Sequence, residues 1–177
     1  MRVFISGGVK NGKSYYAQRL AKQQNARPFY YIATMAPVDD EDFERIERHR
    51  REREGWGFIT VEQHGCIEEI LCKCDTGGSF LLDSLTALLA CEMFPSDGGV
   101  DTKAADRIVK GLTQVIGVLE NIVIVSDYIY SDAEIFDPLT EKFRESLAKI
   151  DRAAAKGCDT VLEIAYSNVI VHKGSVG

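Results

Sequence analysis

Short apolar runs alternate along the chain with longer segments of helical periodicity. The apolar runs are rich in β-branched and aromatic residues and predict strands at 2–6, 28–34, 58–61, 79–83, 121–126, 160–165 and 168–172. The segments between them predict helices at 14–24, 39–54, 85–94, 102–119 and 138–156, with a shorter helical stretch at 67–72. This alternation predicts an α/β fold with a mostly parallel central sheet and helices on both faces. The last two strands are close enough to form a hairpin, which makes the final strand antiparallel.

A glycine-rich segment, SGGVKNGKS, lies between the first predicted strand and the first predicted helix and fits the pattern G-x-x-x-x-G-K-[ST]. In this pattern the backbone N–H groups surround phosphate oxygens, the lysine reaches the β and γ phosphates, and the serine hydroxyl binds Mg²⁺. The alternative is a glycine-rich turn with an incidental lysine, but the flanking strand and helix favour the phosphate-binding loop. We therefore expect a single P-loop NTPase domain of the RecA-like type over 1–177. The predicted nucleotide-binding residues of the loop are Gly7, Gly8, Val9, Lys10, Asn11, Gly12, Lys13 and Ser14.

An acidic residue, Asp83, ends the buried strand predicted at 79–83. In a protein with a phosphate-binding loop, an acid at this place supports Mg²⁺ beside the loop serine, here Ser14. The alternative is a helix N-cap, because Asp83 and Ser84 directly precede an apolar helical segment. The two roles are compatible.

Length and composition narrow the class of protein. The chain has 177 residues, 45% of them hydrophobic, which is enough for one well-buried domain and too little for two. A net charge of −6 excludes the basic surface that nucleic acids or anionic membranes require. No apolar run approaches the roughly 20 residues of a membrane span. The absence of a signal peptide and an odd count of five cysteines favour a cytoplasmic protein with free thiols.

The helix predicted at 39–54 carries a cationic face. Arg45, His49 and Arg53 are spaced by four residues, so they share one side of the helix. Neighbouring guanidiniums disfavour protonation of an imidazole, and the neutral imidazole is a nucleophile. The two arginines are also suited to binding phosphates through paired hydrogen bonds. The alternative is a solvated, salt-bridged helix on which His49 has no special role.

A group of possible zinc ligands follows, consisting of His64, Cys66, Cys72 and Cys74. Their spacing is not one of the usual paired C-x2-C forms. Packing of Cys66 and Cys72 as small apolar residues is the simpler interpretation.

Several motifs together resemble a known family. The order is SGGVKNGKS, then YIAT at 31–34, then R-I-x-x-H formed by Arg45, Ile46 and His49, with Arg53 following. The segments TVE at 60–62 and LLD at 81–83 continue the match. This order resembles the bifunctional adenosylcobinamide kinase/adenosylcobinamide-phosphate guanylyltransferase family of cobalamin biosynthesis. The resemblance is strong up to about residue 90 and weaker to the C-terminus.

The resemblance implies a two-step transfer. GTP binds at the loop with Lys13 in a catalytic role, His49 attacks the α-phosphorus, and a corrinoid phosphate then displaces the histidine to give the GDP-linked product. The same protein phosphorylates the corrinoid hydroxyl from ATP or GTP, and family members form homotrimers. The nucleotide-site residues implied beyond the loop are Thr34, Met35, Ala36, Arg50, Arg51, Glu52, Arg53, Glu62 and Asp83.

The second half departs from the family pattern. Members usually carry N-E-V-G where this chain has DYIY at 127–130, and an arginine and an asparagine where it has Glu141 and Asp151. These differences leave open a kinase without guanylyl transfer, or a non-catalytic nucleotide sensor. Asp127 is either a base near the phosphates or an ordinary turn acid.

Overall fold

The computed structural model describes residues 1–96, 98–131 and 133–175, and the side chains of Arg45 and Glu52 lie outside this description. The strands are β1 (Arg2–Gly7), β2 (Phe29–Ala33), β3 (Phe58–Glu62), β4 (Ser79–Asp83), β5 (Ile122–Asp127), β6 (Thr160–Ala165) and β7 (Asn168–Lys173). The helices are α1 (Lys13–Gln23), α2 (Asp40–Glu52), a 3-10 turn (Ile67–Glu69), α3 (Ile70–Lys73), α4 (Leu85–Met93), α5 (Ala104–Val118) and α6 (Pro138–Gly157). Each strand and helix predicted from the sequence is confirmed, with boundaries that differ by at most about two residues.

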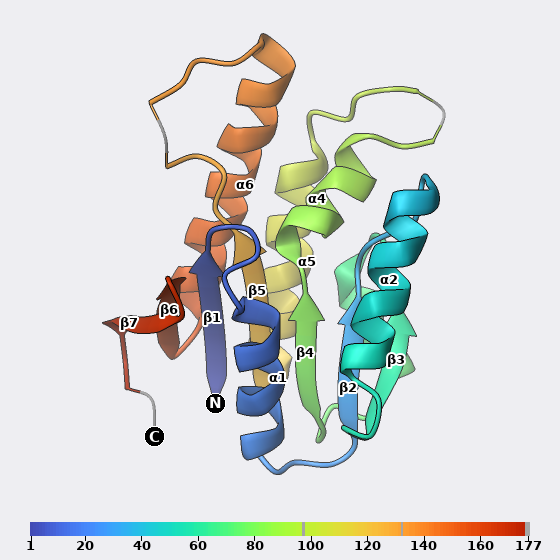
Figure 1. The fold of residues 1–177 in the computed structure, drawn as a ribbon, viewed down its shortest axis with the longest axis vertical. Helices are drawn as coiled ribbons and strands as arrows, with labels where there is room; N and C mark the ends of the chain where they lie inside the picture. Colours follow the sequence, from blue (N-terminus) through green and yellow to red (C-terminus); the bar gives the residue numbers. More distant parts are fainter. Residues whose placement is uncertain (97, 132, 176–177) are drawn as a thin grey trace.

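The strands form one sheet in the order β3-β2-β4-β5-β1-β6-β7 (Figure 1). All neighbouring pairs are parallel except β6 and β7, which form the predicted antiparallel hairpin. The predicted mostly parallel α/β sheet is therefore confirmed.

Helices cover both faces of this sheet. Alternate residues of the central strands face opposite sides: Phe4 and Leu82 pack with α3, α4, α5 and α6, whereas Ile5 and Leu81 pack with α1. Helix α2 stands beside α1 at the β3 end of the sheet (Figure 1). Burial on both faces explains why the central strands are continuous apolar runs in the sequence, without alternation of polar residues.

The carboxyl ends of the strands meet at one edge, which is at the top of Figure 1. Gly7 of β1 lies opposite Asp127 of β5. Glu62, Ala33 and Asp83 are aligned across β3, β2 and β4. The glycine-rich loop and the acids at the strand ends therefore share the edge where parallel α/β sheets bind ligands.

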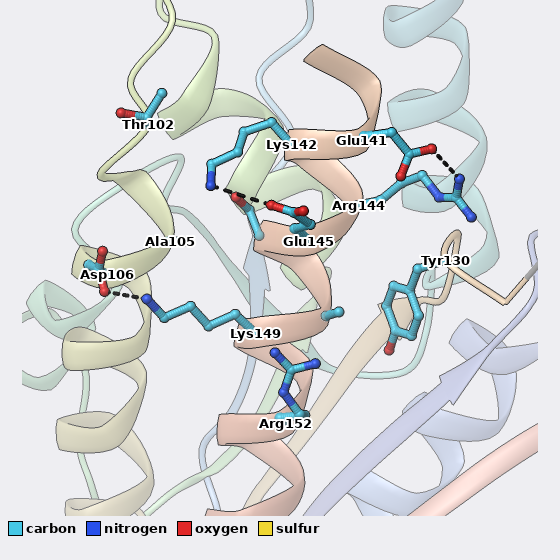
Figure 2. Close-up of a pocket in the computed structure, with 12 residues that line it drawn as sticks. Thr102, Ala105, Asp106, Tyr130, Glu141, Lys142, Arg144, Glu145, Lys149 and Arg152 are labelled. Carbon is cyan, nitrogen blue, oxygen red and sulfur yellow. Dashed lines mark hydrogen bonds and ion pairs between the residues drawn. The ribbon is translucent and has the colours of Figure 1, made fainter. Parts of the chain in front are cut away.

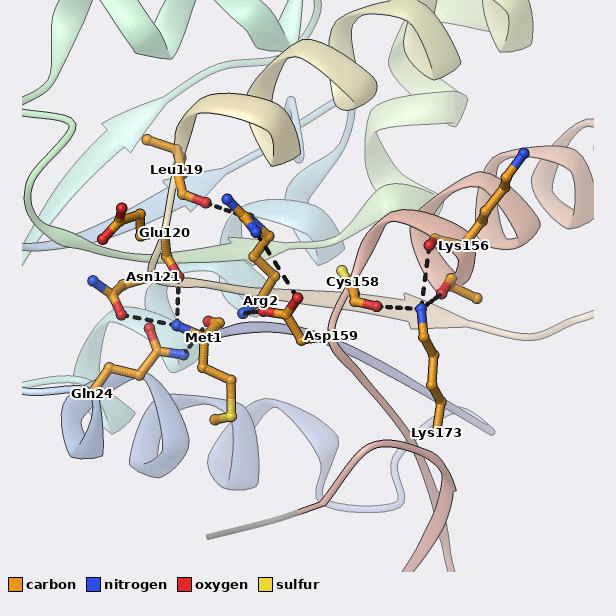
Figure 3. A network of polar contacts seen from close by, with 11 residues as sticks. Met1, Arg2, Gln24, Leu119, Glu120, Asn121, Lys156, Cys158, Asp159 and Lys173 are labelled. Atoms are coloured by element: carbon orange, nitrogen blue, oxygen red, sulfur yellow. Dashed lines mark hydrogen bonds and ion pairs between the residues drawn. The ribbon is translucent and has the colours of Figure 1, made fainter.

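A network of polar contacts lies at the opposite edge of the sheet, where the parallel strands begin (Figure 3). The N-terminal ammonium donates to the Glu120 carbonyl (2.5 Å), and the Arg2 side chain donates to the Leu119 carbonyl (2.9 Å). Lys173 Nζ donates to the carbonyls of Ala155, Lys156 and Cys158 at the end of α6, at 3.2, 3.2 and 2.6 Å. These contacts join the start of β1 to the residues that follow α5, and β7 to the end of α6, at the edge opposite the loop.

Candidate nucleotide and transfer site

Local geometry explains why glycine occupies two positions of the loop. Gly12 has φ 88° and directly precedes α1, a left-handed conformation that a side chain would strain. At Gly7 an added Cβ would lie 2.5 Å from the Ile164 carbonyl oxygen of β6. Asn11 Nδ2 donates to the same carbonyl and anchors the loop to β6. An added Cβ at Gly8 would meet nothing within 4 Å, so a close approach explains Gly7 and not Gly8.

The loop lysine is buried and already bonded. Lys13 is 5% exposed, and its Nζ donates to the Gly8 carbonyl and to Asp127 Oδ1, both at 2.6 Å. Asn11 Oδ1 lies 3.4 Å from the same nitrogen. Three groups of the protein thus hold the ammonium at the place where a phosphate-binding loop presents it to phosphate oxygens.

A cavity of about 280 Å³ opens at the same edge, beyond β4. Its lining residues come from β2, α2, β3 and the β4–α4 junction. They include six side chains that the sequence analysis assigned to the site: Met35, His49, Arg50, Arg53, Glu62 and Asp83. The structure thus gathers residues that are up to 48 positions apart in the chain around one hollow.

The charge pattern of the helix also allowed all of its arginines to be solvated, but Arg53 is buried at this cavity. Arg53 is only 8% exposed, and its guanidinium carbon lies 3.5 Å from the centroid of the Tyr31 ring. The Tyr31 hydroxyl donates to Asp83 Oδ2 at 2.9 Å. Stacking fixes the plane of the guanidinium, as cation–π contact with a desolvated ring does. The sequence analysis missed this role of Tyr31, because a tyrosine within an apolar strand gives no signal beyond packing.

Three of the other assigned residues do not line the cavity. Thr34 Oγ1 donates to the Ser84 carbonyl and accepts from the Ser84 N–H, both at 2.8 Å, so its hydroxyl joins β2 to β4. Ala36 donates its N–H to Cys91 Sγ at 3.4 Å. Arg51 is exposed and pairs with Glu47 at 3.4 Å. Arg45 and Glu52, also singled out from the sequence, lie outside the described side chains.

His64 lines the cavity, although the sequence pattern suggested only a remote zinc role for it. Its Nδ1 lies 3.3 Å from the Thr34 carbonyl, so Nδ1 donates and Nε2 is left as an acceptor in the neutral ring. Among the described residues, no group of three or more His, Cys, Asp or Glu side chains is placed to hold a metal ion. All five cysteines are free thiols, as expected from the sequence.

The two residues that the sequence analysis assigned to Mg²⁺ carry oxygen atoms at this edge. Ser14 lies in the first turn of α1, and Asp83 ends β4 with one carboxylate oxygen bonded to Tyr31. Mg²⁺ prefers oxygen ligands and is usually held by one or two protein groups together with phosphates and water. The alternative prediction of a helix cap is confirmed for Ser84, whose Oγ accepts from the Ala87 N–H at 3.2 Å.

The loop and the cavity are separate subsites on one edge. Strands β5 and β4 lie between β1 and β2, which corresponds to about 14 Å at the usual spacing of neighbouring strands. The loop subsite is open to solvent: Val9 at its turn is exposed, and the next residue, Lys10, has a left-handed backbone with φ 58°. The edge is therefore suited to an elongated ligand with anionic groups at the loop and a further part in the cavity.

A second cavity of about 550 Å³ lies between α5 and α6, and two of the positions that depart from the family pattern, Tyr130 and Glu141, line it (Figure 2). Tyr130 donates its hydroxyl to Asp151 Oδ2 at 2.8 Å, and burial raises the pKa of the Asp151 carboxyl to about 6. Glu141 accepts from Arg144 at 2.7 Å. Tyr130 and Asp151, which both depart from the family pattern, therefore contact each other, whereas Glu141 pairs with Arg144.

Within the described part of the chain, no helix is both long and apolar enough to cross a bilayer.

Solved structures with similar backbones share the fold at low sequence identity. The flagellar accessory protein FlaH from Methanocaldococcus jannaschii has a TM-score of 0.52 at 14% identity and covers 98% of this chain and 78% of its own. The RadB recombinase has a TM-score of 0.52 at 13% identity and covers 98% and 80%. These neighbours confirm the predicted fold, a mostly parallel α/β sheet with helices on both faces.

Sequence relatives are more specific. The "Bifunctional adenosylcobalamin biosynthesis protein CobP" of Pseudomonas aeruginosa is 27% identical over 166 residues, which is 91% of each chain. The "Bifunctional adenosylcobalamin biosynthesis protein CobU" of Escherichia coli is 32% identical over 103 residues, 57% of this chain and 55% of the relative. A family model described as "Cobinamide kinase / cobinamide phosphate guanyltransferase" matches residues 3–167. The chain belongs to the cobinamide kinase/cobinamide phosphate guanyltransferase family.

Proposed function

We propose that this protein is an adenosylcobinamide kinase and adenosylcobinamide-phosphate guanylyltransferase that transfers GMP from GTP through a GMP–histidine intermediate on His49. The observation that carries the proposal is the position of His49 in the cavity with Arg50, Arg53 and Asp83, on the edge that also carries the loop. The relatives named as bifunctional adenosylcobalamin biosynthesis proteins support the same assignment.

The geometry suggests a division of the nucleotide between the two subsites. The β and γ phosphates lie at Lys13 and the loop N–H groups, and the rest of the nucleotide extends toward the cavity. An imidazole nitrogen of His49 forms a bond to the α-phosphorus, the bond to the bridging oxygen breaks, and pyrophosphate leaves. An oxygen of the corrinoid phosphate then forms the new bond to phosphorus and releases the histidine. Dividing the displacement in this way lowers each barrier.

Cationic residues that line the cavity stabilise charge on the transferring group. The guanidiniums of Arg50 and Arg53 line the same cavity as His49, and the plane of Arg53 is fixed by Tyr31. Fixed cations that need no rearrangement stabilise charge that develops in a transition state. Ser14 and Asp83 would hold Mg²⁺, which neutralises phosphate oxygens when bound.

The proposal has further parts that depend on the same assignment. ATP or GTP supplies the phosphate in the kinase step, and a corrinoid is the acceptor in both steps. We also propose that residues 1–177 form one domain, that the protein is cytoplasmic, and that three copies assemble into a homotrimer. Light scattering on the purified protein measures the oligomeric state.

The alternative function is a kinase without guanylyl transfer, or a nucleotide sensor. The Lys13–Asp127 pair and the Tyr130–Asp151 contact favour it, because both involve positions that depart from the family pattern.

One labelling experiment separates these functions. The protein is incubated with Mg²⁺ and GTP labelled at the α-phosphate, beside a His49→Ala variant. We expect acid-labile, base-stable label on the wild type and none on the variant. Tight GTP binding without label refutes the covalent route, and transfer of γ-phosphate to cobinamide then distinguishes the kinase from the sensor.

A further inference from the structure

Asp127 is a carboxylate at the phosphate subsite for which the guanylyl transfer has no use. It ends β5, directly beside the end of β1 where the loop begins (Figure 1). Its Oδ1 lies 2.6 Å from Lys13 Nζ. Because a loop lysine contacts the terminal phosphates of a bound nucleotide, a carboxylate in contact with that lysine lies next to the terminal phosphate.

The backbone around Asp127 is held from both sides. Its N–H donates to Thr86 Oγ1 at 2.9 Å, and the next N–H, that of Tyr128, donates to the Gly7 carbonyl at 3.2 Å. The side chain is 17% exposed, so it is not fully enclosed by the protein. The group is therefore fixed in place and accessible to a second reactant.

Other carboxylates near the edge have different partners. Asp83 accepts from Tyr31 and lies two strands away from β1. Glu163 of β6 is bonded to Tyr128 and His172. Among the described residues, Asp127 is the carboxylate that forms an ion pair with Lys13.

We propose that Asp127 is the general base of the phosphoryl-transfer step. The inference rests on the proposed binding of a nucleoside triphosphate at the loop. The acceptor O–H bond breaks and its proton goes to an Asp127 oxygen, while the acceptor oxygen forms a bond to the terminal phosphorus. The bond from that phosphorus to the β–γ bridging oxygen breaks, and its electron pair leaves with the nucleoside diphosphate. Asp127 then releases the proton to water.

A purely competitive role of Asp127 makes a different prediction. If the carboxylate only occupies Lys13 in the absence of nucleotide, its removal tightens nucleotide binding and leaves the transfer rate unchanged. A general base contributes typically 100- to 10,000-fold to the rate of the step it serves. Affinity and rate therefore distinguish the two roles.

The experiment compares wild type with Asp127→Asn, which preserves shape, and with Asp127→Glu. Asp106→Asn is the matched control, since Asp106 of α5 is an exposed carboxylate that also pairs with a lysine, Lys149 of α6. Affinity is measured with a fluorescent GTP analogue and Mg²⁺. Release of γ-phosphate to water and its transfer to cobinamide are measured at saturating GTP.

We expect Asp127→Asn to bind the nucleotide at least as tightly as wild type and to transfer phosphate at least about 100-fold more slowly. Asp127→Glu recovers part of the rate, and Asp106→Asn matches wild type. Equal transfer rates in Asp127→Asn and wild type overturn the inference, as does a wild type that binds GTP but transfers phosphate to neither acceptor. Failure of every variant and of wild type to bind GTP refutes the proposed nucleotide site itself, and the inference with it.

Discussion

The buried acid Asp151 makes the folded state sensitive to pH. It lies on α6 with 3% of its surface exposed and accepts a hydrogen bond from the Tyr130 hydroxyl at 2.8 Å (Tyr130 is shown in Figure 2). Burial raises the pKa of its carboxyl from 3.8 to about 6, and the hydroxyls of Tyr130 and Ser126 offset part of that rise. The nearby charges oppose each other, because Asp127 raises this pKa and Arg152 lowers it.

The sign of the effect follows from the direction of the shift. A raised pKa means that the folded state holds the proton more tightly than the unfolded chain does, so the contribution to stability is fully present below about pH 4 and is lost as pH rises through 6. A shift of about two pKa units corresponds to about 3 kcal/mol of unfolding free energy. Replacing Asp151 with asparagine removes the ionisation and keeps an acceptor for the Tyr130 hydroxyl.

We therefore expect Asp151→Asn to match wild type near pH 4 and to exceed its unfolding free energy by about 2–3 kcal/mol at pH 8. Urea denaturation at a series of pH values measures the difference between the two proteins, so contributions of other groups cancel. Glu145→Gln is the control, because Glu145 is an exposed acid on the same helix. A difference between Asp151→Asn and wild type that is the same at pH 4 and pH 8 refutes the reasoning.

Two further predictions concern the loop and the end of α6. Gly7→Ala should destabilise the protein by about 1–3 kcal/mol and impair GTP binding, because the added Cβ meets the Ile164 carbonyl, whereas Gly8→Ala should fold normally because its Cβ meets nothing. Thermal unfolding and GTP titration of both variants check this, and equal behaviour of the two contradicts it. Lys173→Met should lower the unfolding free energy by about 0.5–1 kcal/mol, since it removes donors from three carbonyls at the C-terminal end of α6. Urea denaturation measures this difference. Lys110→Met, a change at another exposed lysine, is the control. An equal effect of both changes would count against a role of the contacts at the helix end.

Apolar patterning was sufficient to predict the elements and the fold class. The strands of the sheet centre are continuous apolar runs because both of their faces are covered, as with Leu81 and Leu82, which pack on opposite sides. The position of the loop between β1 and α1 also follows from local sequence, because the need for a left-handed residue at Gly12 is a property of the turn itself. The order of the strands required the tertiary structure, since strands far apart in the chain, such as β1 and β5, become neighbours.

The spacing of residues along one helix was enough to predict that some of the side chains lining the cavity lie on the same side of that helix. His49 and Arg53 share a face because they are one turn apart, which is a local property. The inward position of Arg53 depends on Tyr31, which comes from a different strand, and the charge pattern of the helix contains no information about that partner.

The sequence by itself determined the elements, the loop and the chemical types available at the strand ends, because these depend on neighbours within a few residues. Only the tertiary structure decided which of those groups meet. Lys13 contacts Asp127 and Tyr130 contacts Asp151 across 114 and 21 residues. Burial then sets the ionisation of Asp151, because desolvation depends on everything that packs around a carboxyl and not on the residues beside it in the chain.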